Sequence, residues 1–173
     1  LVGINTQLES VNFWNKIFAM AVLKYPDAPN YAQYKQRMVL FSVAASSCPE
    51  DHNSTEVING YALSNLEGYN ITNEGFAFNG TGRLQPDYMT FICELIAKTG
   101  SIYSYFNQRL PISCQHNIER YINAIIDYEF QENEVIHGTA VQAPYGTILK
   151  PTFDKAYYPQ GNYWGTERSY MLC

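Results

Sequence analysis

The stretch from Pro86 to Phe130, PDYMTFICELIAKTGSIYSYFNQRLPISCQHNIERYINAIIDYEF, predicts a helical hairpin. Proline suits the first turn of a helix because the N–H that it lacks has no partner there, and Asp87 lies at the positive end of the helix dipole. Pro111, in the turn between Asn107 and Ser113, stops the first helix. Apolar residues recur in that helix at intervals of three and four, which predicts one buried face. This face contains Ile92, Leu95, Ile96, Ile102, Tyr103 and Phe106.

A second helix is expected from Gln115, because apolar and polar residues again fall on opposite sides. Its apolar side holds Ile118, Tyr121, Ile122 and Ile125, and its polar side holds Glu119, Arg120, Asn123 and Asp127. One face of the hairpin must therefore be buried by the rest of the chain.

Two further helices are predicted upstream of the hairpin. Thr6-Gln7-Leu8-Glu9 is a capping box, so a helix should follow and end at Pro26. Asn30 is a good N-cap for another helix, which should end near Cys48. The expected core stripe of the first is Val11, Trp14, Phe18, Ala21, Val22 and Tyr25, and that of the second is Tyr31, Tyr34, Met38, Phe41 and Ala45.

The helical pattern is weaker elsewhere. A short helix carrying Val57, Ile58, Tyr61 and Leu63 is possible, although Gly60 argues against it, and a polar loop follows up to Gln85. Residues 135–142 and 145–149 have the composition of short strands, which predicts a hairpin turning at Ala143-Pro144. We therefore predict a mainly α, single domain over residues 1–173, with four to five helices, a short C-terminal β hairpin and an irregular aromatic tail.

The bulk composition excludes some functional classes. The formal net charge is -5, and the 11 basic residues are scattered, which argues against a protein that follows a nucleic-acid backbone. No apolar run approaches the roughly 18 residues of a membrane span. The 15 tyrosines suit both cores and recognition surfaces.

The cysteines and sequons predict a secreted, extracellular protein. The chain starts at Leu1, from which we expect a removed signal peptide. Four cysteines without a CxxC pair are compatible with two disulfides, and reduced thiols are the alternative. A continuous helix would place Cys93 about 20 Å from Cys114, so that pairing is disfavoured and the other pairings remain.

We expect Cys48 to pair with Cys93, and Cys114 with Cys173. Three N-x-[ST] sequons, at Asn53, Asn70 and Asn79, predict glycosylation.

No catalytic or metal-binding constellation stands out. The pairs His116/Glu119 and Glu134/His137 have helical ligand spacing, but a carboxylate-bridged bundle site needs further glutamates, so we predict neither metal nor cofactor. The cluster Glu50-Asp51-His52 with Glu56 could serve calcium or acid/base chemistry. Paired cysteines would leave no thiol nucleophile.

The segment 157–163, YYPQGNY, followed by Gly165 and Cys173, resembles the second signature of the CAP superfamily of secreted proteins. In that signature Y-x-P-x-G-N precedes a glycine and a late cysteine. Lys155 and Ala156 stand where the family has a cysteine and a polar residue, and the family's histidine-bearing G-H-Y-T-Q segment has no counterpart upstream. The resemblance implies a divergent CAP-like secreted protein, and a plain aromatic turn is the alternative.

These patterns favour a non-enzymatic recognition or ligand-binding module, whose partner is a protein or a small apolar or sugar ligand. The alternative is a secreted hydrolase. A flat, exposed aromatic patch would favour a protein partner, a closed apolar cavity would favour ligand carriage, and facing carboxylates in a cleft would favour hydrolysis. The candidate ligand-binding residues are Tyr157, Tyr158, Tyr163, Trp164 and Tyr170. The candidate hydrolase carboxylates are Glu50, Asp51, Glu119, Asp127 and Glu134.

Overall fold

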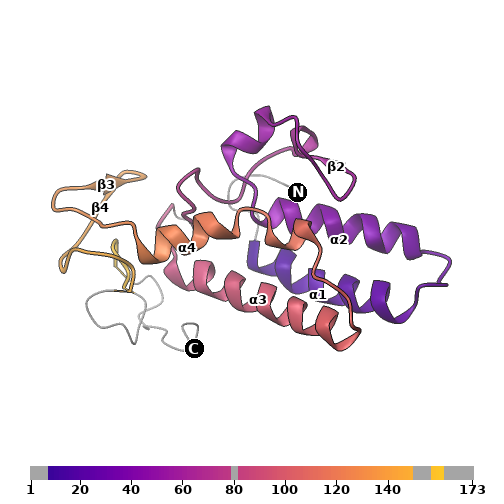
Figure 1. Cartoon of the computed structure of the whole chain (residues 1–173). Helices are drawn as coiled ribbons and strands as arrows, with labels where there is room; N and C mark the ends of the chain where they lie inside the picture. The colour runs from indigo at the N-terminus through magenta and orange to yellow at the C-terminus, as the bar shows by residue number, and fades with distance from the viewer. Residues whose placement is uncertain (1–7, 79–81, 150–156, 162–173) are drawn as a thin grey trace.

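The computed structural model describes residues 8–78, 82–149 and 157–161. Within these residues the protein is mainly α-helical, as the sequence predicts (Figure 1). The helices are α1 (Leu8–Lys24), α2 (Tyr31–Ala45), α3 (Pro86–Tyr105) and α4 (Ile118–Ile126), with 3₁₀ turns η1 (Pro49–Asn53), η2 (Leu63–Asn65) and η3 (Ile112–Gln115). The strands are β1 (Val57–Ile58), β2 (Tyr61–Ala62), β3 (Val135–Ile136) and β4 (Thr139–Ala140).

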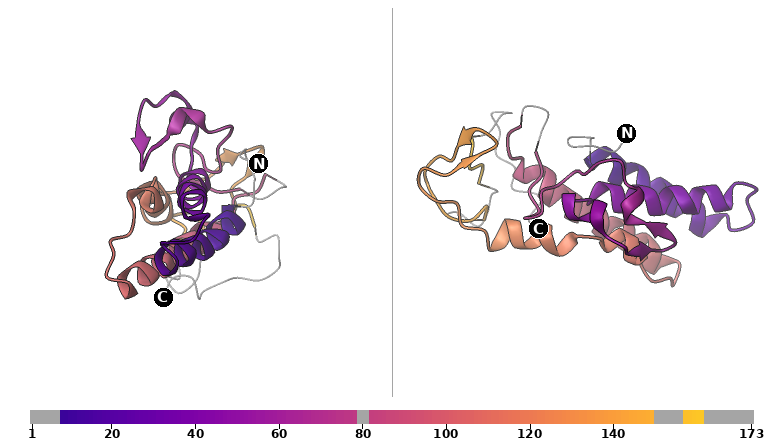
Figure 2. Two further views of the ribbon diagram at one scale, coloured as in Figure 1. Left: turned by 90° about the vertical axis from the view of Figure 1, so that its right-hand side faces the viewer. Right: turned by 90° about the horizontal axis from the view of Figure 1, so that it is seen from above.

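Helix α1 lies between α2 and α3 and packs against both (Figure 1). Helix α2 returns antiparallel to α1 after a short turn, whereas α3 runs in the same direction as α1. The molecule is elongated, with the β3–β4 hairpin at one end and the α1–α2 turn at the other (Figure 2).

The predicted hairpin of α3 and α4 is confirmed. Ile92, Leu95 and Tyr103 of α3 are buried, and Tyr121 of α4 is fully enclosed. Burying each such side chain contributes roughly 1.5–3 kcal/mol, so this stripe anchors the main core. One position differs from the prediction, because Ile122 points outward with 42% of its surface exposed.

The predicted core stripe of α1 is wrong in part. Trp14 and Tyr25 are exposed, whereas Asn12, Asn15 and Ala19 are buried. The reason is that α1 is flanked by two helices, and the smaller side chains on its inner face let both helices approach closely.

Two local predictions are also corrected. Residues 57–62 form a β hairpin and no α-helix, because the Asn59-Gly60 pair, with φ values of 48° and 87°, makes the tight turn that joins β1 to β2, and Leu63 begins the 3₁₀ turn η2. The second hairpin turns at His137-Gly138 rather than at Ala143-Pro144. Positive φ at both central residues again matches the right-handed twist of two short strands.

The described part of the tail is held by hydrogen bonds. Gln160 is buried, and its Oε1 accepts a bond from the Leu84 N–H at 2.8 Å. The carbonyl of Pro159 accepts another from the Gln142 N–H at 2.7 Å. Residues 157–161 are therefore fixed to the body without a cross-link of their own.

Cys48, Cys93 and Cys114 are free thiols, so the expected Cys48–Cys93 disulfide is not formed in this structure. Their surroundings show what the sulfurs do instead. The Cys114 sulfur lies 3.2 Å from the Ser42 hydroxyl, and Asn117 Nδ2 lies 3.6 Å from the Cys48 sulfur. The expected partner of Cys114, Cys173, lies outside the described residues.

Candidate functional site

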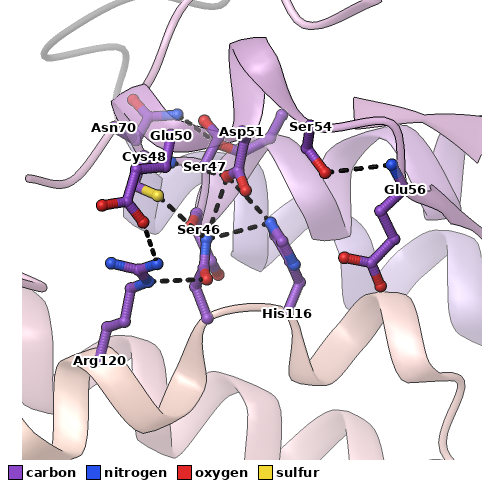
Figure 3. Close-up of polar contacts among 12 residues, drawn as sticks. Ser46, Ser47, Cys48, Glu50, Asp51, Ser54, Glu56, Asn70, His116 and Arg120 are labelled. Atoms are coloured by element: carbon purple, nitrogen blue, oxygen red, sulfur yellow. Dashed lines mark hydrogen bonds and ion pairs between the residues drawn. The ribbon is translucent and has the colours of Figure 1, made fainter. Parts of the chain in front are cut away.

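A polar cluster centred on the buried Asp51 joins η1 to the start of α4, and we call it the polar joint (Figure 3). Its members are Glu50, Asp51, His116, Asn117 and Arg120. The sequence builds η1 by placing Pro49 in its first turn and Asp51 three residues after Cys48. The Asp51 carboxylate accepts the Cys48 N–H at 2.8 Å, which caps the turn.

His116 and Asn117 converge on the same Asp51 oxygen. His116 Nε2 lies 3.0 Å from Asp51 Oδ2, and both side chains are only 8% exposed. Asn117 Nδ2 lies 3.0 Å from this oxygen and 2.9 Å from the Ser46 carbonyl oxygen. Asn117 Nδ2 also lies 3.0 Å from His116 Nε2. An ionised Asp51 carboxylate can only accept, so in the contact between the two side chains His116 Nε2 is the donor.

The electrostatics keep Asp51 ionised. Burial works to raise the pKa of Asp51, but hydrogen bonds from His116 and the Cys48 N–H outweigh burial and lower it. Burial raises the pKa of the Cys48 thiol, and the nearby Asp51 charge adds to this effect. Burial also raises the pKa of Cys114, and that of Cys93 to about 11. The described thiols are therefore poor nucleophiles at neutral pH.

Arg120 completes the joint from α4. Its Nη2 donates to Glu50 at 2.6 Å, its Nε donates to the Asn117 side chain at 3.1 Å, and its Nη1 bonds the carbonyl of Asn73. Gly75 lies against the backbone of Arg120, where a Cβ would come within 2.2 Å of the carbonyl oxygen. With φ at 99°, this position requires glycine for both reasons.

The candidate hydrolase carboxylates are dispersed around the fold. Glu50 and Asp51 are engaged in the polar joint, while Glu119 and Asp127 are exposed on α4. Glu134 accepts hydrogen bonds from the Tyr128 hydroxyl at 2.5 Å and from the Gln131 N–H at 2.9 Å. Among the described residues no group of three or more His, Cys, Asp or Glu side chains is placed to hold a metal ion.

The candidate ligand-binding aromatics are only partly described. Tyr158 is buried in the main core, and the Tyr157 hydroxyl bonds the carbonyl of Gln142. Both therefore contribute to packing. Tyr163, Trp164 and Tyr170 lie outside the described residues.

Two of the three predicted glycosylation sites are described. Asn53 is exposed, whereas Asn70 is only 5% exposed. The Nδ2 atom of Asn70, to which a glycan would be joined, donates to the Ala44 carbonyl at 2.7 Å. A glycan at Asn70 therefore does not fit this fold, and Asn79 lies outside the described residues.

A small pocket opens beside η1. Tyr69, Phe78 and His137 contribute to its wall, and the rings of Phe78 and His137 lie 4.1 Å apart. Its volume is about 100 Å³, well below the roughly 300–1,000 Å³ of ordinary ligand pockets. The pocket is thus a weak candidate for a small-ligand site.

Several large apolar side chains are exposed on α1, and we call this surface the α1 face. It consists of Phe13, Trp14, Ile17, Met20 and Lys24 of α1 together with Tyr105 of α3. Phe13, Trp14 and Ile17 are about half exposed, and Tyr105 is 84% exposed. Between the C-terminal ends of α1 and α3, the surface forms an open groove of about 590 Å³.

The inner side of α1 carries two amides beside the buried Ala19 and Val22. Asn12 and Asn15 are buried, and the Asn15 amide donates to the Ser42 hydroxyl at 2.7 Å. Asn12 Nδ2 and Asn15 Oδ1 have no hydrogen-bond partner among the described residues. Helix α1 therefore turns two amides inward and several large apolar side chains outward.

Sequence reasoning missed the α1 face because α1 carries two apolar stripes. The predicted stripe through Val11 and Val22 is the better match to a core-facing helix. The second stripe, Phe13, Ile17 and Met20, has the same spacing of four and three and was the available signal.

No known protein family, curated protein or solved structure matches this chain. The CAP-like interpretation of residues 157–163 therefore has no family match behind it. Among the described helices, none is both long and apolar enough to cross a membrane.

Proposed function

We propose that the protein is a non-enzymatic recognition module that docks another protein through the α1 face. One observation carries the proposal: α1 buries Asn12 and Asn15 while it leaves Phe13, Trp14 and Ile17 half exposed. Single exposed apolar residues are ordinary, but a contiguous apolar patch beside buried amides is not. A docked protein would remove this apolar surface from water.

The size of the α1 face is that of a protein contact. Aromatic side chains present roughly 150–250 Å² each, so the exposed parts of this face offer on the order of 500 Å² with Ile17 and Met20 included. This is near the upper end of the largest patch on a typical monomer, about 300–600 Å². It is also a large share of the roughly 800 Å² that each partner buries in a standard interface.

The polar joint supports the same proposal by its chemistry. Every polar contact of Asp51 is made to a group of the fold, namely Cys48, His116 and Asn117. A general acid or base must reach the proton of a substrate, and Asp51 is enclosed by its partners. The joint is therefore better suited to locking η1 onto α4 than to hydrolysis.

An extracytoplasmic location is part of the proposal, and the exposed Asn53 sequon supports it. Peptide mapping of the natural protein with and without glycosidase treatment checks this point. We expect a glycan at Asn53 and none at Asn70, and an unmodified Asn53 would contradict the location.

Photocrosslinking tests the docking function. A benzoylphenylalanine at position 17 lies in the α1 face, and one at position 36 lies on the exposed surface of α2 as a matched control. Irradiation in the native host should yield one discrete protein adduct from position 17 and none from position 36. Equal adducts from both positions, or none from position 17, would contradict the proposal.

A further inference from the structure

This inference rests on the proposed function and concerns the chemistry of the partner. We propose that the α1 face binds an amphipathic α-helix whose apolar stripe is bordered by aspartate or glutamate side chains. The shape of the face, its backbone and its charges each contribute one step.

The spacing of the face fits a helix. Phe13, Ile17, Met20 and Lys24 are separated by four, three and four residues, so they form a narrow seam along one side of α1. The seam spans about 16 Å at 1.5 Å per residue, which is three turns of a docked helix. Because α3 runs alongside in the same direction, Ile102 and Tyr105 form the second wall of the groove.

The backbone of the face favours a helix over an extended strand. The central residues of α1 and α3 use their N–H and C=O groups within their own helices. A strand laid on this surface would bury its own backbone groups without partners, which is costly. A helix satisfies its backbone internally and presents only side chains to the groove.

The border of the groove is basic although the chain is acidic overall. Lys24 lines the groove, and Lys16 lies on α1 beside Phe13 of the α1 face. Lys98 of α3 is close enough to interact with Lys16, and it is paired with Glu94. Lys16 lies 4.3 Å from the centre of the Phe13 ring. Burial lowers the pKa of Lys16, the nearby Lys98 charge lowers it further, and the Glu94 carboxylate acts in the opposite direction. Lys16 and Lys24 are therefore the two cations of this edge that have no carboxylate paired with them among the described residues.

This charge arrangement selects among occupants. A second copy of the chain would bring its own Lys16 and Lys24 to the interface, and the nearby Glu94 carboxylate is already paired with Lys98. A helix bordered by carboxylates would place opposite charges beside Lys16 and Lys24, which raises specificity and the association rate. The acidic amphipathic helix is therefore the occupant that best complements the face.

The test uses two synthetic peptides of about 18 residues, long enough to cover the seam. They share one Leu/Ile stripe and differ only in having Glu or Lys along its borders. For this experiment Trp164 is replaced by phenylalanine (Trp164→Phe). Trp14 is then the only tryptophan, and its fluorescence reports binding. We expect the Glu-bordered peptide to bind at least tenfold more tightly than the Lys-bordered one at low salt, with a smaller ratio at high salt.

Charge reversal provides the specific control. Lys24→Glu should abolish the preference for the Glu-bordered peptide, whereas Lys35→Glu, an exposed lysine of α2, should leave it unchanged. The urea midpoints of both variants should match the parent, so that a loss of preference cannot come from unfolding.

Several outcomes overturn the inference, and they separate it from the proposed function. Equal affinity for the two peptides would contradict the proposed acidic border of the partner helix, but it would not contradict protein docking at the α1 face. Self-association that Ile17→Glu abolishes would identify a second copy as the occupant. Binding to anionic vesicles but to neither peptide, together with no protein adduct from position 17, would overturn the inference and the proposed function together.

Discussion

The polar joint and the α1 face differ in whether their buried polar groups have hydrogen-bond partners. In the joint, the buried charge has partners, because Asp51 accepts three donors. At the exposed end of the joint, Arg120 donates to Glu50. On α1, Asn12 Nδ2 and Asn15 Oδ1 are buried without a partner among residues 8–78, 82–149 and 157–161, while apolar side chains face outward. Partnered burial is what a fold needs for its own stability. The contrast with the α1 face is the observation on which the proposed docking of another protein rests.

Removing the centre of the joint should have the largest effect. Asp51→Ala leaves His116, Asn117 and the Cys48 N–H without their shared acceptor in a buried site. We expect the free energy of unfolding to fall by about 3 kcal/mol, at the lower end for a broken buried pair. Urea denaturation measures this value. Glu50→Gln, at the exposed end of the joint, is the control and should cost about 1 kcal/mol or less.

If Asp51→Ala lowers the free energy of unfolding by less than about 1 kcal/mol, the polar joint is dispensable for stability. The contrast drawn between the joint and the α1 face would then be wrong.

The contribution of Asp51 should depend on pH in one direction. The folded state lowers the pKa of this carboxyl below its unfolded value of about 3.9, so the stabilisation is complete above that value and is lost as the pH falls through the folded pKa. The difference in unfolding free energy between the parent and Asp51→Asn should therefore be constant near neutrality and narrow below about pH 4. A difference that widens on acidification would contradict the assigned ionisation.

Replacing a buried amide on α1 should raise the free energy of unfolding, whereas Asp51→Ala should lower it. Asn12→Leu removes a buried Nδ2 that has no partner among the described residues and adds apolar contact. We expect the protein to gain about 1–2 kcal/mol of stability, measured by urea denaturation. Asn15→Leu is the matched variant and should gain less, because it also loses the bond to Ser42. Destabilisation by Asn12→Leu would mean that this amide serves the fold.

The smallest stability effect is expected on the α1 face itself. Ile17→Glu places a charge where the side chain is already half in water, so the unfolding free energy should change by no more than about 0.5 kcal/mol. Thermal unfolding by circular dichroism measures this change. A loss of several kcal/mol would show that the face is part of the core.

The sequence predicted the elements with strong local signals. Pro86, Pro111 and the apolar stripe of α3 located the hairpin because helix propensity and period are local properties. The β1–β2 turn was missed although Asn59-Gly60 is a known hairpin pair, since the surrounding strands are only two residues long. His137-Gly138 was missed in the same way.

The functional surfaces depend on tertiary contacts and could not be predicted in the same way. Asp51 and His116 are 65 residues apart, and no local pattern brings them together. Helix α1 has two apolar stripes, and the packing of α2 and α3 determines which of them is buried. The stripe that is left exposed, Phe13, Ile17 and Met20, forms part of the α1 face.

The central claim is that another protein covers the α1 face. The most direct measurement is the yield of protein adduct from benzoylphenylalanine at position 17, relative to position 36, in the native host. We expect a discrete adduct from position 17 and only background from position 36. Equal yields from the two positions, or no adduct from position 17, would contradict the claim.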